Sequence, residues 1–297
     1  MTSYKIRHTT RYDYEVPVLH AQHLAHLRPR VLPFQRVGSS EVRVAPVARG
    51  ALRSSDYFGN DCDTIELLEP HDALEVTALS RVTLAPRGVD LTQAVTPWED
   101  CVALLRQGPQ HFAVIEYAVD SPLVRAHTMF RSYSQGVFAP RRPLGEVIAE
   151  LNHRIFTDFK YEPSATDIST PLAQVMRERS GVCQDFAHVA IACLRSFGIP
   201  ARYVSGYLET VPPPGQVRLV GADASHAWAA AYIPELGFVD FDPTNDLLPD
   251  QRHITVAWGR DFSDVSPLKG VVLGGGGQRL TVGVDVEPLT DSSSALS

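Results

Sequence analysis

The sequence predicts an α+β protein in which an N-terminal antiparallel β-sandwich is followed by helices packed on an antiparallel sheet. Two changes of pattern along the 297 residues indicate this class. Before Pro86 the apolar residues alternate over short stretches, as they do in half-buried strands. From Leu144 they recur every three or four residues, as on helices, and strand-like stretches return only after Pro200. Helices that precede strands as a group are typical of α+β proteins rather than of alternating βαβ folds.

The first predicted strands are rich in Val, Thr, Ile and Tyr and are separated by turn residues such as Gly, Pro and Asn. They are KIRHTTRYDY, EVRVAP, DTIELL and ALEVTALSRVTL, with FGND as one of the turns. Between residues 87 and 143 several prolines interrupt shorter apolar pieces, which indicates a junction between domains. We therefore expect an N-terminal β-sandwich domain over residues 1–115, a second domain over residues 116–290 and a disordered tail over residues 291–297.

Three helices are predicted near the start of the second domain. The first has an apolar stripe formed by Leu144, Val147, Ile148, Leu151 and Ile155. A short second helix is expected to begin at Pro171, because proline suits the first helical position and Thr170 can cap it. The third begins near Cys183 and ends at Gly198, a residue type that commonly stops helices. The first and third helices therefore each bury one apolar face.

Further strands are predicted at ARYVSGYL, HAWAAAYI, GFVDFD, HITVAW and QRLTVGVDVE. In HAWAAAYI the side chains of His226 and Trp228 share one face of the strand, while Ala227, Ala229 and Ala231 occupy the other. Small side chains let a helix approach closely, so we expect a helix to pack on the alanine face. The last strand is expected to close the second domain.

Composition and charge exclude several classes of function. The formal net charge is -7 and the pI is near 5.9, so the chain has no basic stripe for a phosphate backbone and we expect no nucleic acid partner. No run approaches about 18 apolar residues, and MTSYKIRHTTRYDYEV lacks the apolar core of a signal peptide. We therefore expect no membrane association and a cytoplasmic location. The sequence carries no signal for an oligomeric state.

Cys183 follows the turn residues Gly181 and Val182, at the mouth of the third predicted helix. Unpaired backbone N–H groups and the positive end of the helix dipole favour the thiolate there, and the thiolate is the reactive form of cysteine. The other cysteines, Cys62, Cys101 and Cys193, form no CxxC motif and no short Cys/His cluster. We therefore expect free thiols and no zinc site, with Cys193 packed in the core of the same helix.

A histidine and an aspartate are placed to assist this cysteine. In SHAWAAAYIPELGFVDFDPTND, His226 stands at the start of one strand and an Asp-Pro-Thr sequence at the end of the next. The end of the second strand of an antiparallel hairpin returns beside the start of the first, so Asp242 can lie next to His226. The two-residue period alone leaves Asp240 open as an alternative. Cysteine, histidine and carboxylate together form a nucleophile, a base and an orienting acid.

The segments GVCQDFAHVA, GIPARYVSGYL, SHAWAAAYI and FDPTND together resemble the transglutaminase-like core of papain-type cysteine acyl transferases. The flanking segments resemble the bacterial branch of this family, whose members are also labelled cysteine proteases. YDYEVPV, HLAHLRPR and DYFGND are similar to the N-terminal β-sandwich domain of that branch, and ITVAWGRDFSDVSPLKGVV to its C-terminal segment. The resemblance covers nearly the whole chain and implies a papain/transglutaminase-like fold for the second domain.

The resemblance implies that Cys183 is the nucleophile, His226 the base and Asp242, the aspartate before Pro-Thr, the orienting acid. The reaction would be acyl transfer from an amide bond through a thioester, with the backbone N–H of Cys183 as one oxyanion donor. Animal transglutaminases use a tryptophan upstream of the cysteine as the second donor, and Tyr161 is the residue expected to serve here. Calcium dependence belongs to the animal enzymes. No Asp-rich loop here is spaced like a calcium site, so we expect no metal and no cofactor.

The expected substrate is an amide of a peptide or protein. Trp228 and Tyr207 are candidates to line a substrate groove, although an aromatic residue on a strand is more often part of the core. The loop from Thr210 to Ser225 is expected to set specificity.

Two enzymatic functions and one non-enzymatic function fit these residues. Water as the acceptor makes the protein a peptidase or amidase, and a primary amine makes it a transglutaminase. We favour hydrolysis, because water is abundant and excluding it requires a dry tunnel for the amine. A non-catalytic scaffold is the alternative from another class, although scaffolds of this family usually lose a triad residue. An arylamine acetyltransferase shares the order Cys, His, Asp, but the likeness of the N-terminal domain argues against it.

Overall fold

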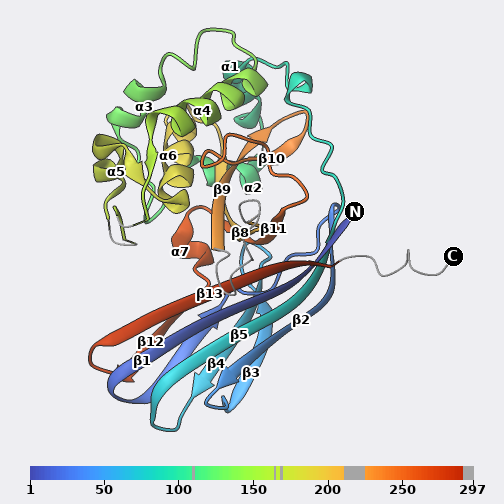
Figure 1. The fold of residues 1–297 in the computed structure, drawn as a ribbon. Helices are drawn as coiled ribbons and strands as arrows, with labels where there is room; N and C mark the ends of the chain where they lie inside the picture. The colour runs from blue at the N-terminus through green and yellow to red at the C-terminus, as the bar shows by residue number, and fades with distance from the viewer. Residues whose placement is uncertain (109–110, 164, 168–169, 211–224, 290–297) are drawn as a thin grey trace, which may run out of the picture.

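The computed structural model describes residues 1–108, 111–163, 165–167, 170–210 and 225–289. The molecule has two parts, one built from long antiparallel strands and the other from helices and a four-stranded sheet (Figure 1). This arrangement confirms the predicted α+β class. The expected tail at residues 291–297 and most of the loop between Thr210 and Ser225 lie outside the described residues.

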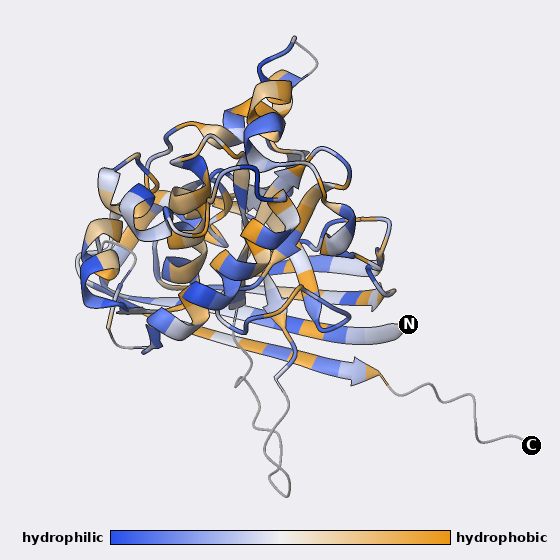
Figure 2. Cartoon of the chain, turned by 90° about the horizontal axis from the view of Figure 1, so that it is seen from above, coloured by the Kyte–Doolittle hydropathy of each residue, from blue (hydrophilic) through white to orange (hydrophobic). Residues whose placement is uncertain are grey.

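The first part is one antiparallel sheet of seven strands. They are β1 (Thr2–Ala25), β2 (Gln35–Ala45), β3 (Gly50–Ser55), β4 (Asp61–Leu67), β5 (His71–Leu84), β12 (Leu268–Gly274) and β13 (Gln278–Leu289). The order is β2-β5-β1-β4-β3, and β12 and β13 both pair with β1. Every second residue is buried between Tyr4 and Thr10, and hydrophobic and hydrophilic bands alternate along the strands in Figure 2.

β1 is 24 residues long, so its two halves pair with different neighbouring strands and hold the sheet together. Up to Asp13 it lies between β5 and β13, and from Ala21 to Ala25 it lies between β4 and β12. The register with β5 shifts between Asp13 and Val18, where Pro17 has no N–H to donate to a ladder. The two layers of the predicted sandwich are therefore halves of one curled sheet.

The last strand lies in a different place from the one the sequence predicts. We expect it to close the second domain because it follows that domain in the chain, but β13 pairs with β1, as does β12 before it. Gly274, Gly275 and Gly276 make the connection between β12 and β13, with φ angles of 99°, 89° and 60° that side chains disfavour. The chain thus returns to the N-terminal sheet, a pairing between the two ends of the sequence that order along the chain does not reveal.

The second part begins after β5. Its helical segments are η1 (Leu91–Gln93), α1 (Trp98–Leu105), α2 (Phe112–Ile115), η3 (Glu116–Ala118), α3 (Thr128–Ser134), α4 (Leu144–Asp158), α5 (Leu172–Glu178), α6 (Cys183–Arg195) and α7 (Phe262–Val265). The predicted boundary near residue 115 assigns α1 to the first domain, but α1 packs against α4. Trp98 explains this placement, because its ring meets the rings of Phe138 and Phe197 edge-on with centroids 5.5 Å apart.

The structure agrees with the predicted helices α4 and α6 and differs from the prediction at the N-terminus of α5. α4 and α6 follow the predicted apolar stripes, and Gly198 after α6 has a φ of 82°. At α5 the structure makes Pro171 the N-cap itself, without a side-chain hydrogen bond. The hydroxyl of Thr170 instead accepts a hydrogen bond from the backbone N–H of Asp167 at 3.0 Å. The Thr170 hydroxyl therefore bonds to the backbone of the preceding turn and does not cap α5.

The second sheet is antiparallel and has the order β10-β9-β8-β11. Its strands are β8 (Ala201–Leu208), β9 (Ser225–Ile233), β10 (Gly237–Phe241) and β11 (His253–Gly259). Ala227, Ala229 and Ala231 are buried in the same cluster as the apolar face of α6, as the small side chains predict. The other face of the sheet carries a separate buried cluster that includes Val204 and Trp228.

The two parts share a continuous hydrophobic core. Tyr4 and Ile6 of β1 and Val286 of β13 belong to the same buried cluster as the apolar residues of α4 and α6. The turn before β4 adds a polar contact, because the side-chain amide of Asn60 exchanges hydrogen bonds of 2.8 and 2.9 Å with the backbone of Trp258. Within the described ranges, no helix has the length and apolar character needed to cross a membrane.

Candidate active site

Cys183 is the first residue of α6, and its side chain is partly exposed. The preceding residue, Val182, is the N-cap, and its backbone N–H donates a hydrogen bond to the Asp185 carboxylate at 2.9 Å. The hydroxyl of Thr166 donates to the same carboxylate oxygen at 2.6 Å. These contacts hold the first turn of the helix, whose free N–H groups and dipole favour negative charge at Cys183.

Tyr161 lies beside this turn. The short strands β6 (Lys160–Tyr161) and β7 (Ser180–Gly181) pair in parallel and bring Tyr161 opposite Gly181, two residues before the cysteine. Partial burial raises the pKa of Tyr161, and its electrostatic interaction with Cys183 adds to the rise. The phenol, which belongs to a residue 49% exposed, is therefore a proton-carrying donor close to the thiol.

His226 is the second residue of β9 and interacts with both Asp242 and Cys183. Its Nε2 lies 2.7 Å from Oδ2 of Asp242, and the side chain of Cys183 also acts on the pKa of the ring. Burial of the ring lowers its pKa, but the hydrogen bonds and the charges of Asp242 and Cys183 outweigh that effect and raise the pKa of His226 to about 10. The imidazolium form is therefore the stable one at neutral pH.

Asp242 has no exposed surface and is surrounded by donors. Its Oδ2 accepts from His226, from Nε2 of His253 at 3.1 Å and from Nδ2 of Asn245 at 2.7 Å. Its Oδ1 accepts from the backbone N–H groups of Thr244 and Asn245 at 2.9 and 3.3 Å. Burial raises the pKa of the carboxyl, but these hydrogen bonds hold it well below its usual range. The carboxylate is thus a fixed negative charge behind the imidazole.

His253 and Asn245 are part of this arrangement, and neither is among the residues predicted from the sequence. His253 begins β11 and is fully buried, with Nδ1 3.4 Å from Oδ1 of Asp250. Asn245 follows the Asp-Pro-Thr sequence directly. The sequence feature that could have indicated Asn245 is its position in that turn, where Asn side chains often hydrogen-bond to the backbone. Only the pairing of β11 with β8 explains the position of His253.

Asp240, the other aspartate that the two-residue period allows, has a different role. Its Oδ2 accepts hydrogen bonds from the indole N–H of Trp228 at 3.0 Å and from Nη1 of Arg87 at 2.5 Å. Trp228 itself is completely buried and packs against His226 and His253, with ring centroids 5.9 and 5.3 Å apart. A side chain without exposed surface does not line an open groove, so this placement does not support the predicted groove role of Trp228.

Tyr207, the second predicted groove residue, is also buried. Its hydroxyl lies 3.0 Å from Nδ1 of His8 in β1, and the other ring nitrogen of His8 lies 3.1 Å from the hydroxyl of Thr10. Burial lowers the pKa of His8 to about 4, so the contact joins neutral groups. Tyr207 therefore connects the two parts of the molecule, and its placement does not support a groove role either.

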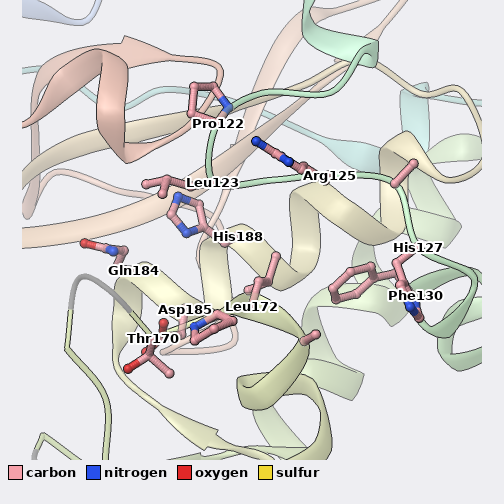
Figure 3. Close-up of a pocket in the computed structure, with 13 residues that line it drawn as sticks. Pro122, Leu123, Arg125, His127, Phe130, Thr170, Leu172, Gln184, Asp185 and His188 are labelled. Atoms are coloured by element: carbon pink, nitrogen blue, oxygen red, sulfur yellow. The ribbon is translucent and has the colours of Figure 1, made fainter.

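A cavity of about 470 Å³ adjoins the first two turns of α6 (Figure 3). Gln184 and His188 of α6 form one side, and Leu172 of α5 and Phe130 of α3 form the apolar part of the wall. Arg125 also lines this cavity. The cavity borders Gln184, the residue after Cys183 in α6.

Among the residues that the structure describes, two groups of side chains have the spacing of metal ligands. Potential ligand atoms of His226, Asp242 and His253 lie within 4.8 Å of one another, and so do those of a second group formed by His26, Asp56 and Cys62. In the first group the same atoms are joined by hydrogen bonds of 2.7 and 3.1 Å. Those hydrogen bonds account for the short distances without an ion.

Two family models match the chain. The model described as "Bacterial transglutaminase-like N-terminal region" matches residues 4–83. The model described as "Transglutaminase-like superfamily" matches residues 131–243, a range that contains Cys183, His226 and Asp242. The two matches fall on the two structural parts of the molecule.

Relatives and a solved structure resemble the chain over different shares of its length. An uncharacterized protein of Mycobacterium tuberculosis is 39% identical over 96% of this chain and 92% of its own, and one of Mycobacterium leprae is 31% identical over 96% and 98%. A protein-glutamine gamma-glutamyltransferase of Pseudomonas aeruginosa is 30% identical over 43% of this chain but only 19% of its own. A crystal structure from Cytophaga hutchinsonii, named "a Putative Cysteine Protease", has a TM-score of 0.78 and 20% identity, and the match covers 99% of this chain and 92% of that one.

Proposed function

Because the chain belongs to the bacterial transglutaminase-like family, a family associated with cysteine-based catalysis, we propose that it transfers acyl groups from the amide bonds of peptides or proteins. Cys183 is the nucleophile, His226 the general acid and base, and Asp242 the orienting acid. One observation carries the proposal: His226 hydrogen-bonds to Asp242 through Nε2, and the side chain of Cys183 raises the pKa of the same ring. That sequence of contacts is the nucleophile, base and orienting group of covalent acyl transfer.

In the first half-reaction, the Cys183 thiolate, paired with the His226 imidazolium, attacks the carbonyl carbon of the amide. The backbone N–H of Cys183 and the phenol of Tyr161 stabilise the oxyanion that forms. His226 then donates its proton to the nitrogen, the C–N bond breaks, and an amine leaves. The acyl group remains on Cys183 as a thioester.

Asp242 keeps His226 in the protonated form that these reaction steps need. Its negative charge stabilises the imidazolium, and the 2.7 Å hydrogen bond to Nε2 leaves the other ring nitrogen to serve Cys183. The donors on Asp242, among them His253, hold the carboxylate ionised and in place. His253 is in this sense a positioning residue.

We propose water as the acceptor in the second half-reaction, which makes the protein a peptidase or amidase. His226 then removes a proton from water, the hydroxide attacks the thioester, and the carboxylic acid leaves as Cys183 is regenerated. The exposure of Tyr161 and the partial exposure of Cys183 support the access of water. Transfer to a primary amine is the second candidate, and the name of the Pseudomonas aeruginosa relative supports it.

The test is a substrate screen with and without an acceptor. The protein is incubated with glutamine-containing peptides, alone or with a labelled primary amine, and the products are separated by mass spectrometry. Chain cleavage or conversion of an amide to an acid indicates hydrolysis, and incorporation of the label indicates transamidation. Cys183→Ala is expected to abolish both reactions while the fold is retained. Turnover that persists in Cys183→Ala contradicts the mechanism.

A further inference from the structure

A second cavity, of about 330 Å³, lies between the two parts of the molecule. It faces the side of the four-stranded sheet that α6 does not cover. Arg202 of β8 and Thr255 and Trp258 of β11 line it from the sheet, and Phe34 and Arg87, which lie beyond β1 and β5, line it from the other side. Cys183 does not border this cavity, so a ligand bound there is independent of the proposed function.

Arg202 is the distinctive residue of the cavity. Its guanidinium is stacked between two rings, 3.7 Å from the centroid of Trp258 and 4.3 Å from that of Phe238. Across the described ranges, none of the hydrogen bonds and ion pairs involves this guanidinium, and its Nε is buried without a partner. Asp240 is its main negative neighbour, but Arg202 and Asp240 flank Ala230 from the strands on either side, so they lie two strand spacings apart.

Two further polar atoms at this cavity are also buried without a partner. One is Nε of Arg87, whose terminal nitrogens donate to Asp240 at 2.5 Å and to the backbone oxygen of His253 at 3.1 Å. The other is the hydroxyl of Thr255. Two arginines face one aspartate at this cavity, which leaves one positive charge in excess. A buried charge and buried donors without partners are unfavourable unless a ligand satisfies them.

We propose that this cavity binds a small organic monocarboxylate, held between Arg202, Arg87 and Thr255. A carboxylate matches the planar fork of a guanidinium, and its single negative charge equals the excess positive charge of the cavity. The remaining wall is apolar and aromatic, including Phe34 and Trp258. Such a wall favours a ligand with an apolar body over a strongly hydrated ion such as phosphate.

The test uses benzoate as the probe and benzamide, a neutral molecule of the same shape, as its control. Calorimetric titration and thermal unfolding are measured with the full chain at constant ionic strength, and inorganic phosphate forms a third arm. Benzoate is expected to bind saturably and to raise the Tm with concentration, whereas benzamide and phosphate do neither. Binding of phosphate in preference to benzoate, or no saturable binding of benzoate, would overturn the proposal.

Variants locate the site. Arg202→Met is expected to weaken benzoate binding by tenfold or more, because it removes the charged donor. Thr255→Val removes one hydroxyl at constant volume and is expected to weaken binding about three- to tenfold. Arg131→Met is the matched control, since Arg131 also stacks on a ring, 4.2 Å from the centroid of Phe197, but lies outside the cavity. Unchanged benzoate affinity in Thr255→Val and Arg202→Met contradicts the site, and Thr255→Val decides alone if Arg202→Met does not fold.

Discussion

Replacing Asp242 with asparagine removes one charge from the centre of the site while keeping the size of the side chain. The wild-type carboxylate accepts hydrogen bonds from five N–H groups, three on Oδ2 and two on Oδ1. An asparagine in this place has one oxygen and one NH₂ group. Whichever way the amide is turned, its NH₂ group faces donors instead of accepting from them.

The loss of stability in Asp242→Asn follows from these contacts. In the better orientation the amide oxygen faces His226, His253 and Asn245, and the NH₂ group faces two backbone N–H groups. Each buried donor left without an acceptor costs about 1 to 3 kcal/mol, so Asp242→Asn is expected to lower the free energy of unfolding by about 2 to 6 kcal/mol. The imidazolium also loses its counter-charge, and the acylation of Cys183 is expected to slow by about 10²- to 10⁴-fold.

Urea denaturation followed by tryptophan fluorescence measures the free energy of unfolding, and the reaction of Cys183 with p-nitrophenyl acetate measures acylation. Asp63→Asn is the matched control, because Asp63 is a buried carboxylate that accepts two 2.7 Å hydrogen bonds from Arg28, far from the site in the N-terminal sheet. It is expected to lower stability and leave acylation unchanged. An Asp242→Asn protein that acylates at the wild-type rate would refute the role assigned to Asp242.

Three further outcomes are expected. The raised pKa of His226 stabilises the fold fully below pH 6.5, and that contribution is lost as the pH rises through about 10. Urea denaturation should therefore show that the difference in the free energy of unfolding between the wild type and His226→Gln shrinks between pH 7 and 10.5. A difference that stays constant over this range would contradict the prediction. Tyr161→Phe is expected to lower kcat about tenfold or more with little change in KM, and an unaltered kcat rules out the phenol as an oxyanion donor. Cys193→Ala, at a fully buried position, is expected to lower the Tm while the acylation rate of Cys183 stays the same.

The grouping of Cys183, His226 and Asp242 could be predicted from the sequence because each residue has a local signature. Cys183 follows a glycine at a helix start, and two strands joined by a short turn carry His226 and Asp242 at their open end. Such signals depend on neighbours within about twenty residues along the chain. The α+β class has the same origin, since it depends only on the order in which helical and strand periods occur.

The features that the sequence did not predict depend on contacts between distant segments. His253 reaches Asp242 only because β11 joins the sheet at β8, and β13 pairs with β1 although most of the chain separates them. Periodicity could not separate Asp240 from Asp242, because both lie on one face of β10 or its extension. The family resemblance selected Asp242, and in the structure Asp240 pairs instead with Arg87, which follows β5.

The most direct test of the central claim is the rate of iodoacetamide alkylation of each cysteine between pH 5 and 9, mapped by mass spectrometry. The wild type is compared with His226→Ala. Cys62, Cys101 and Cys193 serve as internal controls, because burial raises their pKa values to about 11, 12 and 12 and they should react slowly in both proteins.

If Cys183 and His226 form a thiolate–imidazolium pair, Cys183 is labelled fast near pH 6 in the wild type, and labelling slows markedly in His226→Ala. If Cys183 instead reacts only as the pH approaches about 8.5, like an ordinary exposed thiol, and at equal rates in both proteins, the pair does not exist in the free protein and the account is contradicted.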